Sequence, residues 1–246
     1  MTGLLRVLSF LLALPALAGD YPRTLYSYPG RTPIIDGVLS PGEWDDALEF
    51  KGVSNWIHQS GSLSSKDISV RLYVKHDATR LYFAFDVTGD RLSGDAVEIF
   101  LNPSNRWNDR QTPAGDGASW SLLYSLRNGL AGGEPVDDPK ARAVYEKWIR
   151  SGAQQAVAKP KADGHGYVIE WAIAFNPCLE AGPSKFYSSG MGDRAMGLNI
   201  SIYGDGGRAD WLASKGDAPT ELRNWGTLWM KSRPINETQP MKILRD

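Results

Sequence analysis

The sequence contains little of the chemistry on which most catalytic and metal sites depend. Cys178 is its only cysteine, so no internal disulfide can form and the paired-Cys spacing of zinc sites is absent. Its three histidines, His58, His76 and His165, are scattered among Gly, Asp and polar neighbours, which predicts solvated loop positions. With 27 basic and 28 acidic residues, the net charge of −1 offers no electrostatic footprint for nucleic acid. The hydrophobic core alone must therefore hold the fold.

Long apolar runs are also scarce. The run Val7–Leu14 follows Arg6 and precedes Ala16-Leu17-Ala18, the small residues that a signal peptidase recognises. A membrane-spanning helix needs roughly 20 apolar residues, so this run is too short to be an anchor. We therefore expect residues 1–18 to be a cleaved signal peptide, the protein to be secreted or periplasmic, and no integral membrane segment to remain after cleavage.

Alternation of apolar and polar residues is the main secondary-structure signal that is present. It is clearest between residues 70 and 87, where Val70, Leu72 and Val74 share one face and Leu81, Phe83, Phe85 and Val87 continue it after a short connection. Two alternating runs joined in this way predict a β-hairpin. Further strands are expected at 34–37, 96–101, 120–126, 155–159, 167–175, 196–203 and 225–230.

The segments between these strands are rich in Gly, Asp, Pro and Asn. Long loops are expected at 103–119, 129–152 and 204–224, with a short helix within 139–150. Ser40, Pro41 and Glu43 have the spacing of a capped helical turn that directs Trp44 inward. The predicted fold class is all-β, an antiparallel β-sandwich with long loops and one or two short helices. Residues 19–33 are expected to form an irregular N-terminal arm, and 34–246 a single domain.

Aromatic residues are abundant, with nine Trp and ten Tyr. In a β protein with an export signal, large flat side chains fill the core or stack on flat ligands such as sugars. The tryptophans in patterned segments are expected in the core: Trp44, Trp171, Trp225 and Trp229. Those in polar loops are candidates for ligand contacts: Trp56, Trp107 and Trp211.

Six segments, in this order, resemble carbohydrate-binding module family 9. They are Ile35–Trp44, the hairpin around Leu81-Tyr82, Asp95–Phe100, Gly166–Glu170, Met196–Ile200 and Trp225–Leu228. The resemblance rests on the order of the six segments and not on any single motif. The resemblance implies a secreted, non-catalytic carbohydrate-binding β-sandwich whose glycan ligand is linked to polysaccharide breakdown. It also implies glycan-degrading enzymes as partners.

The chain departs from that family where the family's better-known members hold a sugar between two tryptophans. Leu92 occupies the position of the first tryptophan, and Ala218-Pro219 lies near that of the second. An arginine of the sugar-binding members is replaced around Ser121. The resemblance therefore predicts the scaffold better than it predicts the sugar.

The ligand-binding residues expected from these considerations are few. Glu98 resembles the family residue that bonds sugar hydroxyls, and the alternative is that it faces a structural arginine. Asp95, three residues earlier on the strand, points to the other face. Asn199 and Arg127 are expected to add hydrogen bonds. Trp107 and Trp211 are expected to stack.

Calcium is the one cofactor that the resemblance suggests, because family members often carry it in structural sites. Asp77, Asp86 and Asp205 are the candidate oxygen ligands. The sequence contains no twelve-residue calcium loop of the helix-flanked kind.

Three alternatives remain open at this stage. Related sandwiches carry b-type haem, for which Met191, Met196 and His165 are available as axial ligands. A glycoside hydrolase or lyase would use loop carboxylates, and hydrolysis needs two of them about 5 to 10 Å apart. A structural envelope protein with a degenerate site is the third. The sequence favours a binding domain over an enzyme, since no carboxylate pair is distinguished by its context.

Overall fold

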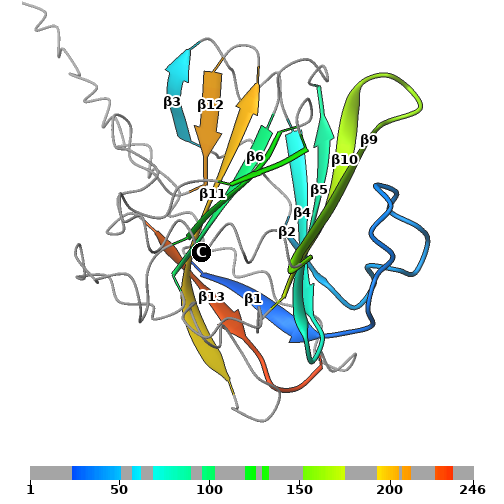
Figure 1. Cartoon of the computed structure of the whole chain (residues 1–246), viewed down its shortest axis with the longest axis vertical. Helices are drawn as coiled ribbons and strands as arrows, with labels where there is room; N and C mark the ends of the chain where they lie inside the picture. Colours follow the sequence, from blue (N-terminus) through cyan, green and yellow to red (C-terminus); the bar gives the residue numbers. More distant parts are fainter. Residues whose placement is uncertain are drawn as a thin grey trace, which may run out of the picture.

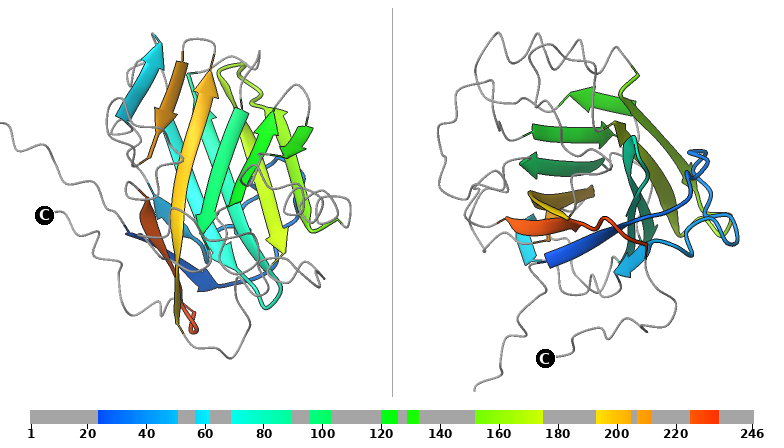
Figure 2. Two further views of the ribbon diagram at one scale, coloured as in Figure 1. Left: turned by 60° about the vertical axis from the view of Figure 1, so that its left-hand side comes forward. Right: turned by 90° about the horizontal axis from the view of Figure 1, so that it is seen from below.

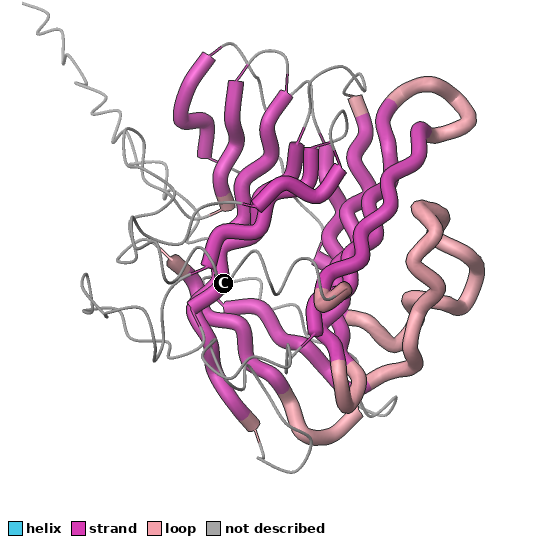
Figure 3. Tube along the Cα trace, in the orientation of Figure 1, coloured by secondary structure: helices cyan, strands magenta, loops and turns pink. Residues whose placement is uncertain are grey.

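The computed structural model describes residues 24–50, 57–61, 69–89, 96–102, 120–125, 129–132, 152–174, 193–204, 207–211 and 225–234. These residues contain thirteen strands and no helix. Figure 3 shows that strands dominate the described part of the chain. The short helix expected within 139–150 and the hairpin-flanking residue Asp95 lie outside it. No helix in the described ranges is long and apolar enough to cross a membrane.

The strands form two layers that face each other, which we call sheet I and sheet II (Figure 1). Sheet I has the order β8-β7-β6-β11-β13, and β12 extends it beside β11 and is followed by β3. Its strands are β3 (Ile57–Gly61), β6 (Ala96–Asn102), β7 (Trp120–Ser125), β8 (Gly129–Gly132), β11 (Arg194–Gly204), β12 (Gly207–Asp210) and β13 (Gly226–Met230).

Sheet II has the order β4-β5-β10-β9, and β2 pairs with the other side of β4. Its strands are β2 (Leu48–Phe50), β4 (Ser69–His76), β5 (Arg80–Thr88), β9 (Gln154–Pro160) and β10 (Gly166–Ala174). The hairpin predicted from alternation is confirmed as β4 and β5, with Val70 opposite Val87 and Leu72 opposite Phe85.

Strand β1 (Thr24–Pro29) joins the two layers. Thr24 to Ser27 pair with β13 in sheet I, whereas Tyr28 and Pro29 pair with β4 in sheet II. Because β1 pairs with a strand of each layer, the layers are parts of one curled sheet. The sheet is mixed, since both pairings of β1 are parallel and those of the other described strands are antiparallel. The expectation of an irregular arm over 19–33 is therefore wrong for residues 24–29. Composition did not reveal this strand, because Thr24 to Ser27 form it by pairing in register with β13.

The core fills the space between the layers, which Figure 2 shows in its view from below. Sheet II contributes the alternating apolar residues of the predicted hairpin, and sheet I contributes Val97, Ile99, Leu198 and Ile200. Trp171 lies at the centre with no exposed surface, and its Nε1 donates a 2.8 Å hydrogen bond to Oε1 of Gln154. The all-β sandwich prediction is confirmed.

A second cluster covers the outer face of sheet II, which the alternation had predicted to be polar. Tyr82 and Ala84 on that face are buried beneath Trp44 and Ala47, with Leu39 packed against them. The covering segment, residues 30–47, contains no strand, so the short strand expected at 34–37 is wrong. Its Asp-Gly turn is present, because Gly37 has φ of 80° and Val38 N–H bonds to Oδ1 of Asp36.

The capped turn expected at Ser40 forms in part. The backbone N–H of Glu43 bonds to the carbonyl of Ser40 at 3.1 Å, and the Glu43 side chain accepts from the Ser40 N–H at 3.3 Å. These contacts close a turn without continuing into a helix. Trp44 points inward, as predicted, and is 5% exposed.

Candidate ligand-binding face

The outer face of sheet I gathers polar residues from the three neighbouring strands β6, β11 and β12. Val97, Ile99 and Leu101 of β6 point into the core, so Glu98 and Phe100 point outward. In the antiparallel register Glu98 lies opposite Ser201 and Phe100 opposite Asn199. One strand further, Arg208 of β12 lies opposite Tyr203. We call Glu98, Asn199, Ser201, Tyr203 and Arg208 the polar face.

The polar face is unusual because much of it is shielded from solvent. Asn199 and Ser201 have no exposed surface, whereas Glu98, Tyr203 and Arg208 are half-buried. Buried polar groups require hydrogen-bond partners, so such a cluster is built rather than incidental. The Tyr203 hydroxyl donates a 2.5 Å hydrogen bond to Oε2 of Glu98, which fixes the orientation of that carboxylate.

Two aromatic rings lie beside the polar face. The ring centroids of Phe100 and Trp225 are 5.7 Å apart, and the rings are tilted by 53°. Both side chains are almost fully buried, at 1% and 2% exposure. Trp225 is thus buried as expected, but it packs against Phe100, which lies on the outer side of sheet I.

The structure brings together only some of the residues that the sequence predicted for ligand binding. Glu98 and Asn199 lie on adjacent strands of the polar face. Trp211 lies on the opposite side of sheet I, where its ring joins the core and is 2% exposed. Its backbone N–H donates to the Ile200 carbonyl at 2.9 Å, which extends the pairing of β12 with β11 by one residue. With its ring in the core, Trp211 has no face on which a sugar can stack. Trp107 and Arg127 lie outside the described residues.

Sequence reasoning did not find Ser201, Tyr203 or Arg208. A signal for the first two was available, since Asn199, Ser201 and Tyr203 alternate with Leu198, Ile200 and Ile202. On a strand whose apolar residues face the core, such polar residues share the outer face. Arg208 gave no comparable signal, because only the pairing of β12 with β11 places it there.

The candidate calcium ligands are not gathered into one site. Asp77 lies in the turn before β5, and Asp86 lies near the far end of that strand. Asp77 accepts hydrogen bonds from Thr32, Thr79 and Tyr82, while Asp86 pairs with Arg71 and Lys161. Within the described ranges no group of three or more His, Cys, Asp or Glu could hold a metal ion. Asp205 lies outside those ranges, and its role stays a prediction.

The hydrogen bonds around Asp77 also set its ionisation. Burial raises the pKa of Asp77, but the hydroxyl and backbone donors of Thr32, Tyr82 and Thr79 outweigh it and lower that pKa to about 2. The same contact and burial raise the pKa of Tyr82 well above its ordinary value. This turn is therefore a structural junction between the covering segment and the hairpin.

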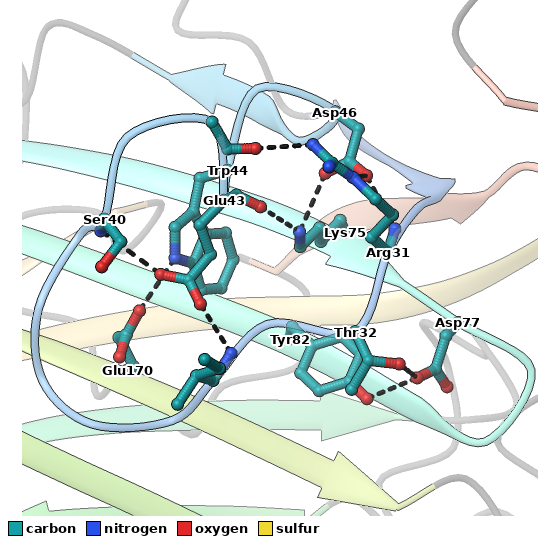
Figure 4. Close-up of polar contacts among 12 residues, drawn as sticks. Arg31, Thr32, Ser40, Glu43, Trp44, Asp46, Lys75, Asp77, Tyr82 and Glu170 are labelled. Atoms are coloured by element: carbon teal, nitrogen blue, oxygen red, sulfur yellow. Dashed lines mark hydrogen bonds and ion pairs between the residues drawn. The ribbon is translucent and has the colours of Figure 1, made fainter.

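Buried charges also gather beneath the covering segment, as Figure 4 shows. Glu170 on β10 has no exposed surface and accepts hydrogen bonds from Asp36 N–H, Gly37 N–H and Trp44 Nε1 at 2.8–2.9 Å. Burial raises the pKa of Glu170, and these three donors oppose that rise. The carboxylate is thus occupied by protein donors, which is typical of a structural role.

Lys75 completes this structural network. Its Nζ donates to the Glu43 carbonyl at 2.6 Å and to Oδ1 of Asp46 at 2.8 Å, and it lies 4.9 Å from the centroid of the Trp44 ring. The same contacts with Lys75 and Arg31 lower the pKa of Asp46 against the opposing effect of burial. These charges hold the covering segment on sheet II.

The histidines and the candidate haem ligands are placed apart. His165 is exposed in the turn between β9 and β10, as expected, but His76 lies on β4 and is 1% exposed. The loop prediction for His76 was wrong, because His76 is the last residue of β4, where it pairs with Pro29 of β1. Met196 lies in the core, away from His165, and Met191 lies outside the described residues.

No protein-family model and no curated protein matches this sequence. Two solved structures share its architecture: a carbohydrate binding module family 9 from Caldicellulosiruptor kristjanssonii in complex with cellotriose, and one in complex with glucose. The first is 17% identical over 89% of this chain and 98% of the other, with a TM-score of 0.58. The second is also 17% identical, over 88% and 100%, with a TM-score of 0.55.

The chain has the fold of carbohydrate-binding module family 9. The family resemblance found in the six ordered segments is therefore confirmed at the level of the fold. Because the match covers nearly the full length of those modules, the two sheets of this chain correspond to a whole family 9 module.

Proposed function

We propose that this protein is a secreted, non-catalytic module that binds a neutral glycan on the polar face of sheet I. The observation that carries the proposal is the buried polar cluster around Glu98, on the fold of modules solved with glucose and cellotriose. A ligand rich in hydroxyl groups is the class that such a polar cluster suits.

The polar face offers complementary hydrogen-bonding groups to a sugar. Glu98, oriented by Tyr203, accepts hydrogen bonds from hydroxyl groups, and hydrogen bonds to a charged acceptor are the stronger ones. Arg208 has only donors, whereas Asn199 has both a donor and an acceptor but no exposed surface, so direct contact with the sugar falls to the half-buried Glu98 and Arg208. Trp107 remains the proposed stacking partner. The affinity is modest, because each contact replaces a hydrogen bond to water.

Binding to a panel of soluble sugars and polysaccharides tests this proposal. Residues 19–246 are titrated calorimetrically with glucose and cellotriose, and are run in affinity gels with β-glucan, xylan and mannan. We expect binding to at least one, weakened about tenfold or more in Glu98→Ala. The control Asp163→Ala removes an exposed turn carboxylate far from sheet I and leaves binding unchanged. Failure of the unmodified chain to bind any of these ligands would contradict the proposal.

A second candidate function, inverting glycoside hydrolysis, has one observation in its favour. Asp210 lies in register with Ser201, which in turn lies opposite Glu98, so the backbones of the two acidic residues occupy one row of the sheet with β11 between them. Two strand spacings put the backbones of the two residues about 10 Å apart, which is the scale of the carboxyl separation that inverting enzymes use. Release of reducing sugar from the same polysaccharide panel, lost in Glu98→Gln, would support catalysis over binding alone.

Export and partners belong to the same proposal. The signal sequence and the expected glycan ligand support delivery outside the cytoplasm, where glycan-degrading enzymes act. Mass determination of the exported protein checks this, with an N-terminus at Gly19 expected.

A further inference from the structure

Three aromatic side chains lie together on the outer side of β1 and β13, where sheet I joins sheet II. Leu25 and Ser27 are buried, so Tyr26 and Tyr28 alternate with them and point outward. Tyr26 is in register with Trp229, on a strand whose alternate residues are buried. Figure 2 shows β1 and β13 side by side. We call Tyr26, Tyr28 and Trp229 the aromatic strip.

Two of the three residues of the aromatic strip are exposed, and Tyr28 is half-buried. Tyr26 and Trp229 are each 38% exposed, so the expectation that Trp229 belongs to the core is wrong. Among the described residues, the only other exposed large hydrophobic side chains are Ile34 and Val38, on the covering segment. The rings of Tyr26 and Tyr28 are 6.4 Å apart and tilted by 33°. Exposed aromatic groups that cluster in this way mark interaction surfaces.

The residues around the strip favour a neutral, hydroxyl-rich ligand. Thr24 and Thr227 lie in register beside it, and both are half-buried. Lys231 pairs with Asp193, so their charges cancel. Anionic membrane surfaces attract an excess of positive charge, which this balanced pair does not supply. Aromatic rings with hydroxyl neighbours match the alternating C–H and hydroxyl groups of a sugar.

The strip is also held rigidly. Its backbone pairs continuously from Thr24↔Thr227 to Ser27↔Met230, and the Lys231 N–H bonds to the Ser27 carbonyl at 2.8 Å. The core side of the same residues packs Leu25, Leu228 and Met230. Aromatic side chains on a fixed backbone lose little conformational entropy on binding, which favours a preorganised surface.

We propose that the aromatic strip is a second carbohydrate-binding surface, which lies flat on an insoluble neutral polysaccharide such as cellulose. It takes the ligand class from the proposed function and uses different residues. The polar face lies along β6, β12 and the C-terminal half of β11, whereas the strip lies on β1 and β13, and β13 pairs with residues 194–198 at the other end of β11. One surface would bind a soluble chain, and the other would hold the module on the bulk substrate.

Depletion isotherms on microcrystalline cellulose test the strip, and calorimetry with cellotriose tests the polar face in parallel. The test variant is the double substitution Tyr26→Ala and Trp229→Ala. The matched control Ile34→Ala removes an exposed apolar side chain, 72% exposed, from another surface. A conservative variant, Tyr26→Phe with Trp229→Phe, retains both rings. Thermal unfolding of each variant establishes that it is folded.

We expect the double alanine variant to bind cellulose about tenfold more weakly, with the phenylalanine variant and Ile34→Ala near the unmodified chain. Cellotriose affinity should not change in any of them. Loss of cellotriose binding in Glu98→Ala with cellulose binding retained would support two separate surfaces. If the polar-face proposal fails, no variant binds cellotriose, yet the strip variants still differ on cellulose.

The proposal is overturned if the unmodified chain does not bind cellulose, or if the double alanine variant binds it normally. It is also overturned if Ile34→Ala loses binding to the same extent. Binding to anionic phospholipid vesicles, or self-association that the double variant abolishes, in the absence of cellulose binding, would assign the strip to a membrane or to a second copy.

Discussion

The indole nitrogen of Trp44 donates a 2.8 Å hydrogen bond to Oε1 of Glu170, which lies 126 residues later in the sequence. The other oxygen of Glu170 accepts the backbone N–H groups of Asp36 and Gly37. One buried carboxylate thus joins the Ile-Asp-Gly segment, the tryptophan that follows it and the central strand β10. Two of the six family-like segments, Ile35–Trp44 and Gly166–Glu170, therefore meet at this carboxylate, and both hold the covering segment on sheet II.

Replacing Glu170 tests how strongly this contact holds the covering segment. Glu170→Ala leaves three buried donors without an acceptor and should lower the free energy of unfolding by about 3 kcal/mol. Glu170→Gln retains one acceptor and avoids the burial of a charge, so its loss should be smaller, about 1 to 2 kcal/mol. Urea denaturation measures both. Sugar binding at sheet I should persist in each folded variant, and equal losses for the two would contradict this account.

Two glycines in one turn provide a paired test of backbone geometry. Both Gly164 and Gly166 have positive φ, at 72° and 119°. A Cβ on Gly164 meets nothing within 4 Å, whereas one on Gly166 would lie 2.0 Å from the Val87 carbonyl oxygen. Gly164→Ala should therefore cost about 1 kcal/mol of unfolding free energy, from backbone strain alone.

Gly166→Ala should cost several times as much, because the β10–β5 pairing must shift to admit the methyl group. Denaturant titration of the two variants measures the difference. Similar stabilities for both would show that the pairing at Thr88 yields more easily than the structure indicates.

Alternation along the chain was sufficient to predict most of the sandwich. Val70 to Val87 and Tyr167 to Ala174 became paired strands because period-two burial is a strong local signal. Strand β1 was missed, since a short segment with Pro and Tyr acquires strand geometry only from β13 and β4 on either side. The burial of Tyr82 was missed for a similar reason, because residues 30–47 cover it from a distance in sequence.

The candidate site was less predictable than the fold. Glu98 was found through a family resemblance, but the partner that orients it, Tyr203, is 105 residues away. Trp211 looked like a loop aromatic, yet its place in register after β12 turns it into the core. Residue type and local context cannot distinguish the two faces of a strand whose register is set by distant neighbours.

The buried His76 predicts a pH dependence of stability. Burial lowers its pKa to about 4, despite the opposing effects of Asp77 and of a hydrogen bond with the Lys231 backbone. The unfolded chain binds this proton near the ordinary value of 6.5, so between these values it holds more protons than the folded chain. Stability is therefore fully present above about pH 6.5 and falls as the pH decreases toward 4, by on the order of 3 kcal/mol.

Urea denaturation at several pH values measures this slope, and His76→Gln should flatten it. The contribution of Glu170 has the opposite sign, because its raised pKa favours the protonated folded state at low pH. Asp77 adds a pH dependence only below about pH 4, because the stability that its lowered pKa contributes is lost as the pH falls from about 4 toward 2. An unchanged slope in His76→Gln would show that another group is responsible.

The hydroxyl group of Tyr203 should control the affinity of the polar face for a sugar, because it fixes the orientation of Glu98. Tyr203→Phe removes the hydroxyl that donates to Glu98 at 2.5 Å and leaves the ring in place. The carboxylate then loses its fixed orientation, so we expect affinity for the bound sugar to fall about 3- to 10-fold, equivalent to about 1 kcal/mol. Calorimetric titration measures the change.

The matched control is Tyr73→Phe, which removes a tyrosine hydroxyl that bonds Glu49 at 3.2 Å on sheet II. This substitution deletes the same chemical group from the other layer and should leave sugar affinity unchanged. A structural role for Tyr203 alone would lower the unfolding temperature of Tyr203→Phe and leave its affinity unaltered. Reduced affinity with an unchanged unfolding temperature assigns Tyr203 to the positioning of Glu98 for the ligand.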